Sequence, residues 1–394
     1  MDHLIGRFRW IEDEEAWMGI RPAWQRLLDS DPRHSAFLSW EWLSVWWRHF
    51  GAERRLRILV GEDAAGTVRA ILPLQVARPR RLGLASPAVW QLLGADSVAC
   101  SDHLGLIAEP GLSVAARHAM ALELGRALPP SAALCLSDLA PDDPLLTALR
   151  TWASARERPY TDMAGPICPV LTLPESWEAL LADLSANFRS QVRSSLRRAS
   201  EKQGWALHSI EDGDEVREAM QLLVRLNRQR LRSKGIRSSL EQPAMAAFLK
   251  EVAPVLVESG RAWLDALTWR GRGVALALHL VQGDTVSYYQ GGFDVELSEY
   301  RPATVLFAAV MQRAIAQGYR RFDFLRGAEA YKYRWGAQAQ PSAGLCMPPV
   351  AWLSRRLYAL EHLRPQAWLR QLWRHSWRGA AVALAVVGSV YDGA

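Results

Sequence analysis

The stretch that decides the fold is residues 261–293, RAWLDALTWRGRGVALALHLVQGDTVSYYQGGF, in the second half of the chain. Three predicted strands lie within it: Arg261–Trp269, Gly273–Val281 and Thr285–Phe293. The connectors Arg270-Gly271-Arg272 and Gln282-Gly283-Asp284 are short and contain glycine, as antiparallel hairpins require. We therefore expect a three-stranded antiparallel meander.

Helices and single strands flank this meander. The predicted helices before it are Glu175–Gln203, Asp214–Ser233 and Gln242–Ser259, and after it come a loop over Asp294–Pro302, a helix over Ala303–Gln317, a strand over Arg320–Leu325 and a short strand near Ala343–Met347. A meander followed by a helix and a separate strand is typical of α/β (mixed α+β) layering. We expect a mixed, largely antiparallel central sheet flanked by helices.

The first half of the chain repeats this order of elements. Its predicted helices are Trp17–Leu28, Ser39–Gly51, Ser113–Ala127 and Asp142–Ala155, the last with Asp142 as N-cap, and its predicted strands are Leu56–Val60, Val68–Val76, Val89–Leu93, Leu104–Ile107 and Ala132–Leu136. We therefore predict two tandem domains of one fold. The proline-rich segment Pro159–Pro174 marks their junction, which places the domains at residues 1–165 and 166–347, followed by a helical, Trp/Arg-rich apolar tail over 348–394.

Composition and charge restrict the class of protein. A chain of 394 residues with 49% hydrophobic and 22% charged residues is globular. The four cysteines lie far apart in the sequence, a spacing that fits neither a zinc site nor a disulfide framework and indicates a reducing compartment. No His/Cys/Asp cluster has metal-ligand spacing, so we expect no metal. The net charge of +6 permits an anionic partner without identifying it.

The N-terminal residues have no apolar run of signal-peptide length. The long apolar run Gly379–Val390 is shorter than the ~20 residues that a membrane-spanning helix needs, so it is either a terminal core helix or an interfacial anchor. We expect a cytoplasmic protein with possible contact at the inner membrane face through this tail.

A helix start follows the meander at Tyr300-Arg301-Pro302-Ala303-Thr304. The first turn of a helix offers unpaired N–H groups and a partial positive charge, which suit a pyrophosphate, and Arg301 adds a charge-assisted contact. A helix that starts with proline is also an ordinary feature of globular proteins.

The block from Tyr319 to Lys332, YRRFDFLRGAEAYK, follows the same helix. Together with Tyr288–Asp294 and the element order, it resembles the GNAT acetyltransferases, and within them the acetyltransferase domain of the cellulose-biosynthesis (CelD-like) family, which is related to Fem-type peptidoglycan aminoacyltransferases. The resemblance covers about Phe188–Gly336. It implies an acyl-CoA co-substrate whose pyrophosphate lies at the helix start, with Tyr300, Arg301, Ala303 and Thr304 as cofactor-binding residues. The family usually has Ser-Pro-Gly where this chain has Arg301-Pro302-Ala303.

Four residues of the Tyr319–Lys332 block are candidates for catalysis. The ammonium of Lys332 or the phenol of Tyr331 could stabilise the oxyanion that forms when an amine attacks a thioester. Glu329 or Asp323 could accept the proton of that amine. The alternative is that both carboxylates brace the loop and that Lys332 is a solvated charge.

Further residues are candidates for acceptor binding. Arg189, Arg193 and Arg197 stand four apart and form a basic stripe beside an apolar one, either as a solvated face or as a clamp for an anionic acceptor. His279 alternates with leucines on a predicted strand and is either a buried sheet residue or a base. Tyr289 and Asp294 lead into the loop before the helix and are assigned to the substrate site.

Three functions remain open. The first is acyl transfer from acyl-CoA to an amine or hydroxyl of a polysaccharide (such as cellulose or another exopolysaccharide), lipid or cell-envelope precursor, by direct attack in a ternary complex, since no Cys or Ser lies in a nucleophile setting. The second is a Fem-type transferase that uses aminoacyl-tRNA, against which the absence of a heptad pattern in Asp214–Ser259 argues. The third is a non-catalytic, envelope-associated binding module. Apart from the tRNA donor of the second function, we expect no nucleic-acid partner.

Overall fold

The computed structural model describes residues 5–78, 80–81, 84–95, 98–199, 203–351, 354–356 and 358. The described chain forms two compact units, one built from residues up to Pro166 and from Pro341 onward, the other from Ile167–Gln340. The chain leaves the first unit along β11 (Thr161–Thr172) and returns along β17 (Gln338–Met347). Residues 341–347, which the sequence analysis assigned to the second domain, therefore belong to the first unit. Most of the predicted tail, including Gly379–Val390, lies outside the described residues.

The first unit contains two sheets with strand orders β1-β3-β4-β9 and β17-β10-β8-β5-β2, and a small β6-β7 pair. Its elements are β1 (Arg7–Ile11), α1 (Glu14–Gly19), α2 (Arg21–Ser30), η1 (Ala36–Leu38), α3 (Trp40–Phe50), β2 (Arg54–Leu56), β3 (Ile58–Glu62), β4 (Val68–Leu72), β5 (Leu74–Ala77), β6 (Arg80–Arg81), β7 (Leu84–Ala85), β8 (Val89–Leu92), β9 (Ile107–Ala108), α4 (Val114–Ala127), β10 (Ala133–Leu139) and α5 (Pro144–Ser154). Tryptophans of α2 and α3 fill its core, because Trp24, Trp42 and Trp46 are fully buried.

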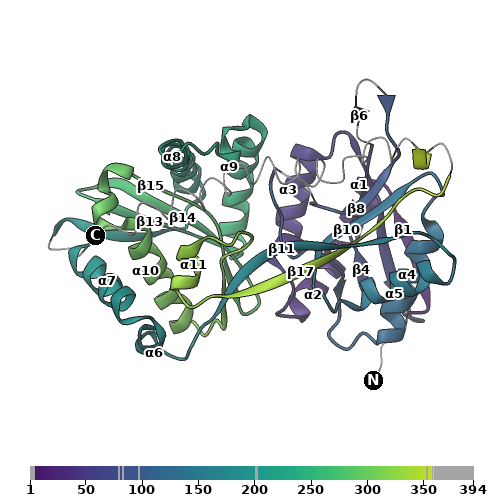
Figure 1. Ribbon diagram of the computed structural model, residues 1–394, viewed down its shortest axis with the longest axis horizontal. Helices are drawn as coiled ribbons and strands as arrows, with labels where there is room; N and C mark the ends of the chain where they lie inside the picture. Colours follow the sequence, from purple (N-terminus) through teal and green to yellow (C-terminus); the bar gives the residue numbers. More distant parts are fainter. Residues whose placement is uncertain are drawn as a thin grey trace. The chain divides into compact units, whose positions relative to one another are not determined.

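The second unit is a sheet of order β12-β13-β14-β15-β16-β11 with helices on both faces. Its elements are α6 (Trp177–Asp183), α7 (Ala186–Arg198), β12 (Trp205–Ile210), α8 (Gly213–Arg232), η3 (Ser239–Glu241), α9 (Pro243–Glu258), β13 (Ala262–Trp269), β14 (Arg272–Gln282), β15 (Thr285–Phe293), η4 (Val295–Tyr300), α10 (Pro302–Ala316), β16 (Arg321–Asp323) and α11 (Ala330–Arg334). Helices α8 and α9 cover one face, and α7 and α10 cover the other (Figure 1).

The predicted meander is confirmed. Strands β13, β14 and β15 pair antiparallel in sequence order. The first connector turns at Arg270 and Gly271, whose φ angles are 50° and 76°, the left-handed geometry that a tight hairpin turn favours. β16 then pairs parallel to β15, which makes the sheet mixed.

Several predicted boundaries are wrong for local reasons. The helix predicted over Glu175–Gln203 is two helices, because Ser185 has an extended backbone and its side chain caps α7 through the N–H of Phe188. Asp143, and not Asp142, caps α5. The strand predicted over Leu104–Ile107 is only the two-residue β9.

The cysteines are closer than their sequence spacing indicated. Cys135 of β10 and Cys346 of β17 lie opposite one another with their Cα atoms 4.2 Å apart and form a disulfide, although 211 residues separate them in the sequence. The inference from spacing was therefore wrong, since strand pairing joins residues that are remote in the sequence. The cysteines therefore no longer support the prediction of a reducing compartment.

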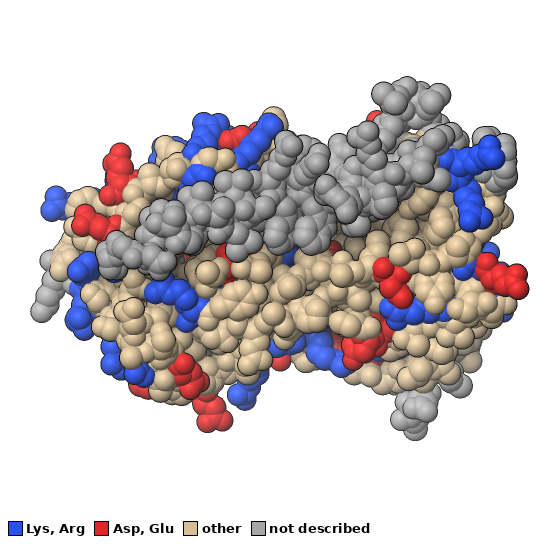
Figure 2. Space-filling view, in the orientation of Figure 1, with Lys and Arg blue, Asp and Glu red and all other residues tan. Residues whose placement is uncertain are grey.

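Charge is spread over the visible surface. On the face drawn in Figure 2, basic and acidic side chains of the described residues are interspersed among uncharged ones instead of forming one basic field. Anion recognition therefore has to be sought in local groups of residues. Among the described residues, no helix is long and apolar enough to cross a membrane.

Candidate active site

In the second unit, the parallel strands β15 and β16 pair over only part of β15, and the stretch beyond their last pair is called the opening below. β15 and β16 pair over three residues only, from Thr285 opposite Arg321 to Ser287 opposite Asp323. β15 then continues to Phe293, whereas the chain after β16 turns away. A bulge precedes this continuation, because His279 pairs with Tyr288 and Leu278 pairs with Gln290, which leaves Tyr289 as the extra residue. The bulge bends β15 at the point where its partner leaves.

The loop after β16 is held by internal bonds. Asp323 is 5% exposed, and its Oδ1 accepts the N–H of Leu325 at 2.7 Å. This bond supports a positive φ of 55° at Leu325, a conformation that non-glycine residues rarely adopt. Gly327 has a φ of 112°, and a Cβ there would lie 2.5 Å from Oε2 of Glu329. Asp323 and Glu329 thus both contact this loop, as the bracing interpretation of the sequence required.

Lys332, on α11, bonds to the backbone of this loop. Its Nζ donates to the carbonyl oxygens of Leu325 (3.0 Å), Arg326 (2.9 Å) and Gly327 (3.1 Å) and lies 2.9 Å from Oε2 of Glu329. The residue is 2% exposed, which excludes a solvated charge. An ammonium has three protons, so these four acceptors use all of them.

Two phenols pack on the ring of Phe307. Tyr331 stacks on Phe307 with ring centroids 5.9 Å apart, and Tyr288 meets the same ring edge-on at 4.8 Å. Tyr331 is 38% exposed, and burial of the rest of its side chain raises its pKa well above the usual value. Burial also raises the pKa of Tyr288. Both phenols therefore keep their protons at neutral pH and can donate hydrogen bonds.

His279 is a buried sheet residue. It is 0% exposed on β14, between Tyr288 and Phe322, with ring centroids 5.6 Å and 5.8 Å away. Neither ring nitrogen has a hydrogen-bond partner among the described residues, and Nδ1 lies 3.9 Å from Oδ2 of Asp265. Burial, and then the Arg313 charge, lower the pKa of His279 to about 3, so it stays neutral near pH 7.

The start of α10 has the features that the sequence indicated. Arg301 is the N-cap with a φ of 52° and makes no side-chain cap, and Pro302 opens the helix. Ala303 and Thr304 follow in the first turn and are half-buried. Tyr300 packs against Trp205 with ring centroids 5.3 Å apart and against Trp269 at 6.4 Å, which anchors the loop before the helix.

The arginines of α7 do not share one environment. Arg189 donates to the carbonyl oxygens of Leu181 and Ala182 at the end of α6, at 3.4 Å and 3.2 Å. Arg193 and Arg197 are exposed. Leu196, the neighbour of Arg197, packs against the cluster that contains Val305 and Leu306 of α10.

Asp294 lies before that helix start. It caps η4 through the N–H of Glu296 (3.1 Å) and pairs with Arg272 at 2.8 Å, which fixes the course of the loop.

Sequence reasoning missed Arg230 and Asn227 of α8. Asn227 Nδ2 donates to the carbonyl oxygen of Gly291 at 2.8 Å, and the Arg230 guanidinium lies 5.6 Å from the centroid of Phe293. Helical periodicity shows which face of α8 is buried but not which strand it meets, so no pattern in the sequence indicated them.

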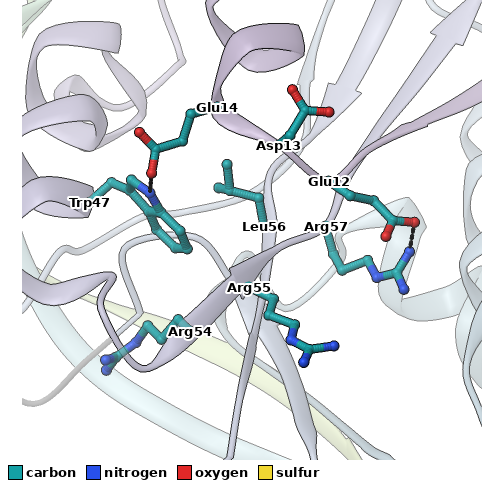
Figure 3. A pocket seen from close by; sticks show the side chains of 8 residues that line it. All are labelled: Glu12, Asp13, Glu14, Trp47, Arg54, Arg55, Leu56 and Arg57. Carbon is teal, nitrogen blue, oxygen red and sulfur yellow. Dashed lines mark hydrogen bonds and ion pairs between the residues drawn. The ribbon is translucent and has the colours of Figure 1, made fainter.

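Two pockets lie apart from this opening and contain no catalytic or cofactor candidate. One pocket, of about 290 Å³, lies in the first unit. Four of the residues that line it already bond to one another in pairs (Figure 3): Arg57 pairs with Glu12, and Trp47 Nε1 donates to Glu14 at 2.8 Å. The other, of about 350 Å³, lies at the ends of β12 and α9. Within the described part of the chain, no group of His, Cys, Asp and Glu side chains could hold a metal ion.

Comparisons with known proteins agree with this architecture. Three solved structures are similar in fold: one titled FemX (12% identity, TM-score 0.61, 82% of this chain and 95% of that one), a conserved protein of unknown function from Bacteroides thetaiotaomicron (10%, 0.52, 86% and 100%), and the C-terminal domain of a protein named as a lysylphosphatidylglycerol synthetase from Agrobacterium fabrum (12%, 0.51, 88% and 96%). A comparison with curated protein sequences finds no match.

A family model locates the relationship within the chain. Residues 186–333 match the model described as the acetyltransferase (GNAT) domain, and these residues contain the meander, α10 and the loop that ends at Lys332. The predicted fold class, a mixed α/β protein with tandem GNAT-like domains, is confirmed. The second unit thus contains a segment that is similar to the GNAT acetyltransferase domain.

Proposed function

We propose that the second unit transfers an acyl group from an acyl-CoA to an amine or hydroxyl acceptor by direct attack in the opening between β15 and β16. The observation that carries this proposal is the divergence of these strands beside the uncapped start of α10. An extended thioester arm can lie along the open edge of β15 while its phosphates contact the first turn of the helix.

The donor phosphates would contact the α10 start. Arg301 supplies charge, the first-turn residues Ala303 and Thr304 border the phosphates, and Tyr300 holds the loop. The Thr304 N–H already donates to the carbonyl oxygen of Arg301 at 2.9 Å, so it is not among the free donors. Arg197, whose neighbour Leu196 packs with the cluster around the first turns of α10, would add a second positive charge.

In the reaction, the acceptor nitrogen or oxygen forms a bond to the thioester carbonyl carbon, and the carbon–sulfur bond breaks. Glu329, half-exposed at the loop, accepts the acceptor's proton, and the Tyr331 phenol donates a hydrogen bond to the carbonyl oxygen or to the departing sulfur. CoA leaves as a thiolate that takes up a proton.

The other candidates have supporting roles in this proposal. Lys332 and Asp323 position the loop, because their polar groups bond to its backbone. His279 stays neutral and takes part only in the packing of the sheet. Tyr289 contributes the bulge, and Asp294 fixes the approach to α10.

The acceptor class follows from the resemblance to the cellulose-biosynthesis family: a polysaccharide, lipid or cell-envelope precursor, with Arg193 as an exposed contact. The aminoacyl-tRNA donor has less support, because α8 and α9 pack together on the sheet and do not form a projecting arm (Figure 1).

Calorimetric titration of the full chain with acetyl-CoA tests the proposal. We expect saturable binding that Ala303→Glu weakens more than about tenfold, since a carboxylate there repels phosphate. Ala244→Glu is the matched control, because Ala244 follows Pro243 at the start of α9 just as Ala303 follows Pro302 in α10. The proposal is rejected if acetyl-CoA does not bind, or if both substitutions have the same effect.

A further inference from the structure

Helix α8 approaches the open part of β15 at very short range. A Cβ on Gly292 would lie 2.4 Å from the backbone nitrogen of Asn227, so only glycine permits this approach. Asn227 bonds to the carbonyl oxygen of Gly291, and its Oδ1 accepts from Ser238 at 2.7 Å. This docking fixes the rotation of α8, and the residue one turn after Asn227 is therefore held at the same strand.

That residue is Arg230. Its guanidinium lies over Phe293, and its Nε is buried without a hydrogen-bond partner among the described residues. A buried donor of a permanently charged group that lacks an acceptor costs free energy, and a bound anion is one partner that would offset this cost. Exposed arginines elsewhere on the helix, such as Arg225, do not carry this cost.

A cation and an anion influence the same two phenols. Burial is the main cause that raises the pKa of Tyr288 and of Tyr331, and in both cases Arg230 opposes the rise while Glu329 adds to it. Arg230 and Glu329 thus act on the pKa of both phenols in opposite directions. Lys234 adds charge near Arg230, since burial and then the Arg230 charge lower the pKa of Lys234.

We propose that Arg230 binds a carboxylate or phosphate group that the acceptor carries beside its nucleophilic amine or hydroxyl, while Glu329 faces the nucleophile itself. This proposal rests on the function proposed above and adds the chemical class of the acceptor. The guanidinium presents paired donors that match the oxygens of either anion. An acceptor without an anionic group leaves Arg230 unpaired and binds more weakly.

Arg230 belongs to α8, but the ring that its guanidinium contacts packs near the start of α10, so the donor phosphate site has to be filled before the acceptor is tested. Helices α8 and α10 cover opposite faces of the sheet, and the start of α10 is the proposed site of the donor phosphates (Figure 1). Phe293, the ring under the Arg230 guanidinium, packs against the cluster that contains Val305 and Leu306 of α10, so CoA must occupy the donor site when the acceptor's anion is measured.

The test is calorimetric titration of the full chain, saturated with CoA so that the donor phosphate site is filled. The probes are O-phosphoethanolamine, which carries both groups, ethanolamine and inorganic phosphate. We expect the wild type to bind O-phosphoethanolamine at least about tenfold more tightly than ethanolamine. Arg230→Met, which keeps the aliphatic stem over Phe293, should lose that preference, Arg230→Lys should retain part of it, and Arg225→Met should leave it unchanged.

Three results would overturn the proposal: equal affinity for O-phosphoethanolamine and ethanolamine in the wild type, an unchanged preference in Arg230→Met, or no saturable binding of any probe. The wild-type affinities for O-phosphoethanolamine and ethanolamine test the proposal even if Arg230→Met does not fold. Acetyl-CoA affinity is measured alongside. If acetyl-CoA binds and the anion preference is absent, only this inference fails. If an Arg230-dependent preference exists and acetyl-CoA does not bind, the donor assignment fails instead.

Discussion

Lys332 and Glu329 form an ion pair of 2.9 Å in which the lysine side chain is 3% exposed and the glutamate side chain 47% exposed. The asymmetry separates their roles. All protons of the lysine are used within the loop, whereas the glutamate keeps an exposed surface that a substrate can reach.

Removal of the Lys332 charge should destabilise the fold. Lys332→Met leaves three buried or half-buried carbonyl oxygens without this donor, and we expect the free energy of unfolding in urea to fall by about 3 kcal/mol. Lys250→Met, on an exposed position of α9, is the control and should change it little. Wild-type stability combined with abolished turnover would instead assign Lys332 to catalysis.

Removal of the Glu329 carboxylate should affect turnover more than stability. For Glu329→Gln we expect kcat to fall by about 100-fold, because the proton acceptor is lost. The free energy of unfolding should fall by less than about 1 kcal/mol, since the ion pair is half-exposed. CoA release from acetyl-CoA with the best acceptor of an amine panel measures kcat, and Glu218→Gln on α8 is the control. An unchanged kcat removes Glu329 from the mechanism.

His279 should make stability depend on pH. Its pKa is about 3 in the folded chain and near the ordinary 6.5 in the unfolded chain, so between these values the unfolded chain binds more protons. The contribution of neutral His279 to the free energy of unfolding is therefore fully present above pH 6.5, and it is lost as the pH falls from 6.5 towards 3. From about pH 7 to about pH 5 we expect a loss of roughly 2 kcal/mol that His279→Leu abolishes.

The control for this pH dependence is the exposed residue His208. His208→Leu should retain the wild-type dependence. Urea unfolding of the three proteins at each pH gives the comparison, and identical pH slopes for wild type and His279→Leu would contradict the burial of a neutral imidazole.

The disulfide between Cys135 and Cys346 should protect both residues from alkylation. In unreduced, denatured protein we expect mass spectrometry to find a linked pair of peptides containing these residues, which separate after reduction. Reduction should lower Tm, because the bond closes a long loop and removes freedom from the unfolded chain. The Cys135→Ser/Cys346→Ser variant should show no response of Tm to reductant. Alkylation of both residues without reductant would exclude the bond.

The sequence by itself determined the second-half meander, its tight turns and the helix that follows. These elements depend on residues that are close in the chain: period-two apolar patterns predict strands, and glycine between them permits the reversal. The same local rules failed at Ser185, because a serine inside a polar helical pattern is either a helical residue or a cap, and packing selects between the two.

The candidate site was predictable only in part. The motif around Asp323–Lys332 indicated the correct loop, yet no sequence pattern could show that Lys332 Nζ reaches three carbonyl oxygens or that His279 is fully buried. Only the tertiary structure shows that Cys135 contacts Cys346 and that Arg230 contacts Phe293. Such contacts join segments far apart in the chain, and they form only when the sheet pairs its strands and the helices pack on its faces.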